Sequence, residues 1–151
     1  DGNATRLLIL KIDYDGNLIW RKFYDFEPSH IGYGSIIEHS NGYVFTGENT
    51  IIKINKDGDI IWYKLNKDFI KDNTSITSLN VDSENNIYII GKRSSEEPQK
   101  GSEGVISKIN SFGELIWEKK FKISLFDNFY DLTINSNDEI FILGTTETKG
   151  A

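Results

Sequence analysis

Short apolar stretches alternate with polar turns along the whole chain, and the alternation itself repeats. The pattern Lys-Ile-Asx-x-x-Gly-x-(Ile/Leu)-Ile-Trp occurs three times, at residues 11–20, 53–62 and 108–117. After each copy comes an apolar stretch that ends in glycine, at residues 42–47, 86–91 and 139–144. This glycine follows the Trp by 27, 29 and 27 residues, respectively. Three matched pairs at matched spacing indicate an internal structural repeat.

Each repeat predicts four short antiparallel strands. The Asx-x-x-Gly segment is typical of a hairpin turn, because the Asx side chain caps the turn and glycine adopts the positive φ that the turn needs. A second polar turn precedes the glycine-terminated stretch, for example at Ser40-Asn41-Gly42. No segment of about 11 residues or more has the 3.6-residue period of an amphipathic helix. We therefore expect an all-β protein.

A repeat of roughly 40–55 residues with four antiparallel strands is typical of a β-propeller blade. Labelled A to D from the central axis outwards, the expected strands are A 34–39, B 43–48, C 50–55 and D 59–65 in one blade, and A 76–82, B 87–92, C 104–110 and D 115–121 in the next. A C–D half blade within residues 1–24 and an A–B half blade at residues 130–145 flank the blades at 34–65 and 76–121. Together the two half blades supply the four strands of one blade. Residues 1–151 therefore correspond to three blades in a circularly permuted order, with the cut in a B–C loop.

Three blades are too few to close a propeller, because such rings have about 4–8 blades. One possibility is that the chain is part of a larger propeller, which its first residue, Asp1 in place of Met, favours. The other is a homo-oligomer in which two copies form a six-bladed ring and each half blade completes that of the partner. Both arrangements cover the apolar faces that an open arc of blades exposes.

The three Trp motifs resemble the tryptophan-docking motif of the PQQ-like propeller repeats. They also resemble repeats of secreted bacterial and archaeal proteins with a Lys-Leu-Asp-x-x-Gly-x-x-x-Trp core and a Gly-Tyr-(Ile/Val)-x-x-Gly strand, which Lys11, Lys53 and Lys108 match better. The resemblance implies structural, blade-docking roles for the Trp and turn Gly residues of the motif: Trp20, Trp62, Trp117, Gly16, Gly58 and Gly113. We expect the strand-ending glycines to have the same kind of role: Gly47, Gly91 and Gly144. It implies no PQQ, because the cofactor-stacking Trp, the Ca²⁺ site and the catalytic Asp of the PQQ-dependent dehydrogenases cannot be placed in this sequence.

Composition narrows the classes of function. The net charge is −6 and Lys and Arg do not cluster, which argues against nucleic acid as the main partner. The absence of Cys excludes disulfides, thiolate metal sites and cysteine catalysis. No apolar run approaches the roughly 18 residues of a membrane span. Since the repeats that this chain resembles mostly belong to scaffolds outside the cytoplasm, we expect an extracellular or cell-envelope protein.

Most candidate catalytic and metal-binding residues have a plainer interpretation. The turns Asp13-x-Asp15-Gly16-Asn17 and Asn55-x-Asp57-Gly58-Asp59 resemble part of a calcium loop. Neither supplies the about six oxygen ligands of such a loop, and Phe112 replaces the second Asp in the third copy, so we expect hairpin turns without metal. We expect His30 and His39 to have surface or packing roles. The carboxylates on or beside the inner strands are expected to line a wet central channel rather than to act as a catalytic pair: Glu38, Asp82 and Asp131.

Aromatic residues lie in the D–A connections, and we expect most of them to pack between blades rather than to contact a ligand: Tyr24, Phe26, Tyr33, Phe69, Phe126, Phe129 and Tyr130. Aromatic side chains of this kind pack between blades, stack on sugars or anchor protein interfaces. Asn3 and Asn73 begin N-glycosylation sequons. The function that we favour is a non-catalytic scaffold or recognition module that binds protein and needs no cofactor. The alternatives are a carbohydrate-binding propeller and a segment of a propeller enzyme whose catalytic residues lie elsewhere.

Overall fold

The computed structural model describes residues 6–25, 34–47, 50–65, 70, 74–97 and 100–147, and every element named in these ranges is a β-strand. The strands are β1 Leu7–Ile12, β2 Leu18–Tyr24, β3 Ile36–His39, β4 Gly42–Gly47, β5 Thr50–Asn55, β6 Ile60–Leu65, β7 Thr74–Val81, β8 Ile87–Ser94, β9 Ser102–Ile109, β10 Leu115–Phe121, β11 Asp127–Ile134 and β12 Ile140–Thr146. The prediction of an all-β protein is confirmed. No helix within the described ranges is long and apolar enough to cross a membrane.

The twelve strands form four antiparallel units in chain order. They are the N-terminal hairpin (β1–β2), the first sheet (β3–β6), the second sheet (β7–β10) and the C-terminal hairpin (β11–β12). In both four-stranded sheets, neighbours in sequence are neighbours in space. The strands lie within three residues of the positions predicted from the repeat pattern. No closed ring is formed by the described part of this chain, so the propeller itself stays a prediction.

The hairpin turns of the Trp motifs form because an Asx side chain organises each of them. The Asn55 side-chain oxygen accepts hydrogen bonds from the backbone N–H groups of Asp57, at 2.9 Å, and Asp59, at 2.8 Å. Asn110 caps its turn in the same way, and Asp13 accepts from the backbone N–H of Asn17. The turn glycines Gly16, Gly58 and Gly113 have φ angles of 85°, 81° and 79°, a region that side chains disfavour. The predicted turn chemistry is confirmed.

A β-bulge precedes the Trp in all three copies of the motif. In the first sheet, Lys53 lies opposite Trp62 and Ile54 lies opposite Ile60, so Ile61 has no partner across the strands. The N-terminal hairpin and the second sheet have the same register shift at Ile19 and Ile116. A bulge inserts one residue and re-aims its neighbours. Here the Trp packs against the apolar layer shared with the next unit, and the inserted isoleucine projects from the edge strand as an exposed side chain.

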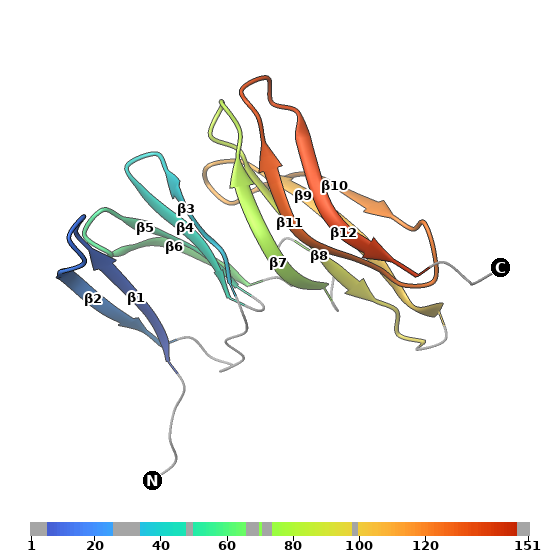
Figure 1. Cartoon of the computed structure of the whole chain (residues 1–151), viewed down its shortest axis with the longest axis horizontal. Helices are drawn as coiled ribbons and strands as arrows, with labels where there is room; N and C mark the ends of the chain where they lie inside the picture. Colours follow the sequence, from blue (N-terminus) through green and yellow to red (C-terminus); the bar gives the residue numbers. More distant parts are fainter. Residues whose placement is uncertain are drawn as a thin grey trace, which may run out of the picture.

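Consecutive units pack face to face and enclose three apolar layers (Figure 1). The first layer joins the N-terminal hairpin to the first sheet around Phe45, Ile52 and Ile54. The second layer joins the two sheets around Val44, Ile51, Ile87, Ile89 and Ile109, among others. The third joins the second sheet to the C-terminal hairpin around Tyr88, Ile90, Ile106 and Leu132. Burial of each such isoleucine contributes about 2 kcal/mol, so the layers are the main source of stability.

The burial pattern of each strand follows from how many of its faces are covered. The central strands β4, β5 and β8 are buried at almost every position because a unit packs on each side. β1, in contrast, alternates between half-buried and exposed residues, because only one of its faces is covered. The N- and C-terminal hairpins lie at opposite ends of the stack, and each leaves its outer face open (Figure 1).

Candidate interaction surfaces

Two of the three tryptophans dock on the turn glycine of the next unit. A Cβ atom on Gly58 would lie 3.1 Å from the Trp20 ring, and one on Gly113 would lie 3.3 Å from the Trp62 ring. Trp62 also donates an indole hydrogen bond of 3.2 Å to the backbone carbonyl of Ser111, in the same turn. Each turn glycine therefore leaves room for a ring as well as adopting a positive φ.

Trp117 of the third motif and Gly16 of the first motif make no such contact among the described residues. Trp117 packs edge-on against Tyr88 of its own sheet, with ring centroids 5.8 Å apart. The Lys119 ammonium lies 5.5 Å from the Trp117 ring centroid. At the other end of the chain, a Cβ atom on Gly16 would meet no described atom within 4 Å. Within the described residues, Gly16 is thus a docking position without a ring.

The strand-ending glycines have different surroundings. A Cβ atom on Gly91 would lie 2.2 Å from the backbone oxygen of Ser75, and one on Gly144 would lie 2.5 Å from that of Asn128. Both glycines face a register shift in the preceding strand, where the two backbones approach closely. A Cβ atom on Gly47 would meet none of the described atoms within 4 Å.

The carboxylates near the inner strands do not form one site. Asp82 is buried, caps the β7–β8 turn and forms an ion pair of 2.9 Å with Lys108. Burial opposes its ionisation, but hydrogen bonds from Lys108 and Asn86 outweigh that effect and lower the pKa of Asp82. Asp131 accepts a hydrogen bond of 2.8 Å from Ser78, and Glu38 is exposed. The expectation of a solvent-facing channel lining is wrong for Asp82, since its carboxylate is used inside the fold.

The buried charges of Arg93 and Asp127 were not anticipated from the sequence, and both are bound within the protein. Arg93 donates two hydrogen bonds to Glu118, of 2.9 and 2.8 Å, and one to Thr74. Asp127 accepts hydrogen bonds from two backbone N–H groups and from Thr146. Because each group already has its partners, these residues have structural rather than chemical roles. Their signal in the sequence is weak, since the partners of Arg93 are 19 and 25 residues away and Thr146 is 19 residues from Asp127.

The described residues contain no group of three or more His, Cys, Asp or Glu side chains that could hold a metal ion. The turn carboxylate of Asp13 binds Asn17 through both of its oxygens. His39 is buried, with its Nε2 atom 3.0 Å from the backbone oxygen of Asn85, and burial lowers the pKa of His39. His39 therefore has a packing role, and His30 lies outside the described residues.

Most of the described aromatic candidates are used in packing. The Tyr24 hydroxyl donates a buried hydrogen bond of 2.7 Å to the backbone oxygen of Gly58. Phe129 packs against the third apolar layer, and Phe126 is half-buried. Tyr130 is half-exposed, with its hydroxyl 3.1 Å from that of Thr145. The other predicted aromatic and sequon residues lie outside the described residues: Phe26, Tyr33, Phe69, Asn3 and Asn73.

Exposed apolar residues recur at matched positions on three edge strands. The bulge residues Ile19, Ile61 and Ile116 are 54%, 53% and 50% exposed. The residues before them, Leu18, Ile60 and Leu115, are also exposed. The strands that carry these pairs, β2, β6 and β10, lie at the edges of their units. Packing within the chain does not account for these six side chains, which we call the outer-edge pairs.

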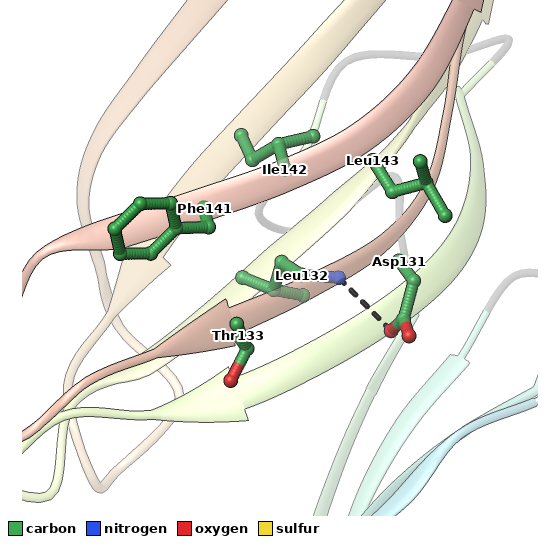
Figure 2. A pocket seen from close by; sticks show the side chains of 6 residues that line it. All are labelled: Asp131, Leu132, Thr133, Phe141, Ile142 and Leu143. Carbon is green, nitrogen blue, oxygen red and sulfur yellow. Dashed lines mark hydrogen bonds between the residues drawn. The ribbon is translucent and has the colours of Figure 1, made fainter.

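The two open end faces are also apolar. On the N-terminal hairpin, Leu8, Leu10 and Ile12 are 45–58% exposed. A groove of about 260 Å³ lies between β1 and the β3–β4 part of the first sheet, where Ile36 and Phe45 line it. On the C-terminal hairpin, Phe141 and Leu143 are 55% and 67% exposed beside a shallow hollow of about 220 Å³, whose side chains are drawn in Figure 2. Exposed apolar surface that recurs in this way is typical of interaction sites.

The sequence matches no protein-family profile, and no curated protein matches it. Its fold is similar to that of a solved structure, a protein of unknown function from Bacteroides caccae, with a TM-score of 0.61 and 12% sequence identity. The similar region covers 91% of this chain and 50% of the other, so this chain spans about half the length of that protein. The similarity concerns the fold alone.

Proposed function

We propose that the chain is a β-propeller segment in which the two sheets are whole blades and the two hairpins are half blades. Three features support this architecture: consecutive units stack face to face, both four-stranded sheets have the same strand order, and Trp20 and Trp62 dock on the next turn. In a propeller, β3, β7 and β11 would be the inner strands and β2, β6 and β10 the outer ones.

We further propose that this segment is a non-catalytic scaffold that binds protein, outside the cytoplasm or in the cell envelope. The observation that carries the proposal is the recurrence of the outer-edge pairs on all three outer strands. An exposed edge strand with apolar side chains is a template for an added strand or an apolar partner surface. The motif resemblance to secreted repeats supports the location.

A binding experiment with matched variants tests this function. The purified protein would be immobilised and exposed to an envelope fraction of its source organism, before and after protease treatment of that fraction. We expect binding that protease abolishes, and at least a tenfold loss when Ile61→Lys and Ile116→Lys are combined. Both side chains are half-exposed, so the double variant should fold. Lys120→Ser, also on β10 and exposed, is the matched control and should bind as the wild type does.

The competing functions predict different outcomes. A carbohydrate-binding protein would bind a glycan array and would keep its binding after proteolysis of the envelope fraction. A segment of a propeller enzyme would bind a small substrate, and the double variant would leave that binding unchanged. Binding that does not respond to the Ile61→Lys and Ile116→Lys changes would overturn the role of the outer-edge pairs.

A further inference from the structure

The strands β1 and β12 each have one edge that no described strand covers. In both complete sheets the equivalent strands pair with each other, as β4 with β5 and β8 with β9. β12 corresponds to β4 and β8, because each carries the glycine that follows a Trp motif. β1 corresponds to β5 and β9, because each leads into the Asx-x-x-Gly turn. The chain thus contains both halves of one missing strand pair.

The register of that pair follows from the two complete sheets. In the first sheet, Phe45, two residues before Gly47, lies opposite Ile52, ten residues before Trp62. In the second sheet, Ile89 and Ser107 have the same offsets from Gly91 and Trp117 and also lie opposite each other. In the missing pair these positions are Ile142 and Leu10. The same rule pairs Leu143 with Ile9.

The side-chain directions in the two hairpins agree with this register. Ile142 packs toward the second sheet, and Leu10 is exposed on the outer face of β1. Ile9 packs toward the first sheet, and Leu143 is exposed on the outer face of β12. Residues that lie opposite in a sheet share a face, so the pairing would cover both exposed side chains with an existing apolar layer.

The docking of the tryptophans points to the same arrangement. Trp20 and Trp62 dock on Gly58 and Gly113, whereas Gly16 is empty and Trp117 has no following turn among the described residues. If β1 continues the sheet of β11 and β12, the turn at Gly16 comes next to Trp117. The hollow beside Phe141 and Leu143 and the groove bordered by Leu8 and Leu10 would be filled in the same step.

One chain cannot make this pairing with itself, because its N- and C-terminal hairpins lie at opposite ends of the stack (Figure 1). We propose that a second copy of this chain covers both end faces, with β12 of each copy paired to β1 of the other and Trp117 docked on Gly16. A two-fold axis makes the two junctions identical and closes a ring of six sheets. The proposal rests on the propeller architecture proposed above.

The first test is solution mass combined with designed disulfides. We expect a particle of about twice the 17.3 kDa chain mass. The chain has no Cys, so Leu10→Cys with Ile142→Cys introduces the only thiols. Facing residues of antiparallel strands have Cα atoms about 4.5–5.5 Å apart, which suits a disulfide. Oxidation should give a covalent dimer, whereas the control Leu10→Cys with Leu143→Cys, whose side chains point to opposite faces, should give at least tenfold less.

The second test separates the junction from the fold. Asn tolerates positive φ, so Gly16→Asn fits the open space around Gly16 in the single chain but would clash with a docked Trp117. We expect its dimer dissociation constant to rise about tenfold or more, with an unchanged circular dichroism spectrum. Gly58→Asn, the matched control, clashes with Trp20 inside the chain and should lower the melting temperature.

Three outcomes would overturn the proposal. A soluble monomer would show that other blades, or nothing, cover the end faces. A ladder of disulfide-linked multimers would indicate an open array, and equal cross-linking in both Cys variants would refute the register. A monomer that still binds protein through Ile61 and Ile116 would refute only the pairing of two copies, so the proposed function is tested separately.

Discussion

Replacement of Trp62 by Ala tests whether the tryptophans hold neighbouring sheets together. Trp62 packs against the second apolar layer, lies against Gly113 and donates its indole hydrogen bond to Ser111. Truncation of a buried Trp costs about 3–5 kcal/mol. Because Trp62 is half-buried, we expect a loss of about 3 kcal/mol, of which about 1 kcal/mol belongs to the hydrogen bond.

Thermal and urea unfolding measure this loss. For a chain of this length, about 3 kcal/mol lowers the melting temperature by about 6–12 °C. Trp62→Phe keeps most of the ring and loses the indole donor, so it should fall between the wild type and Trp62→Ala. Melting of Trp62→Ala within one degree of the wild type would refute the docking role. Equal losses for Phe and Ala would indicate that the hydrogen bond, rather than the packed ring, supplies the stability.

Two smaller predictions concern buried polar groups. Asp82→Asn should cost about 2 kcal/mol at pH 7, because it leaves Lys108 without its ion pair. Folding lowers the pKa of Asp82, so this contribution to stability is present above the ordinary value of 3.8 and is lost as the pH falls below it. The urea midpoints of the variant and the wild type should therefore converge near pH 2. A gap between the midpoints that stays constant with pH would contradict the ion pair as the source of the stability. Ser107→Ala should keep or raise the melting temperature. The reason is that the Ser107 hydroxyl is the only buried side-chain polar atom in the described ranges without a hydrogen-bond partner. A clear drop in the melting temperature would show that the hydroxyl does have a partner.

Features set by neighbouring residues could be predicted from the sequence. The Asx-x-x-Gly turns are local, so the spacing of Asn55 and Gly58 was enough to place a hairpin there. The alternation of apolar stretches and turns placed the strands for the same reason. The bulges at Ile19, Ile61 and Ile116 were not predicted, because a bulge depends on the register between two strands and leaves only a weak trace in one strand's pattern.

Features set by distant residues could not be predicted. Arg93 and Glu118 come together because β8 and β10 flank β9, and neither local sequence identifies the other as its partner. The same limit explains the error over Asp82. Its position beside an inner strand suggested a solvent-facing carboxylate, but the turn that follows and Lys108 on β9 enclose it.

The three Trp motifs show why the repeat gives information beyond local structure. Trp62 and Trp117 have nearly the same neighbours in sequence, yet a turn follows Trp62 in space and none among the described residues follows Trp117. The local sequence is nearly the same, so the difference between the surroundings of Trp62 and Trp117 comes from the unit that packs on each sheet. Gly16, with the turn conformation of Gly58 and no ring against it, is the converse case. Because Trp20 and Trp62 each meet the turn of the next unit, we infer that Trp117 and Gly16 make the same contact across the junction proposed above, where Leu10 lies opposite Ile142.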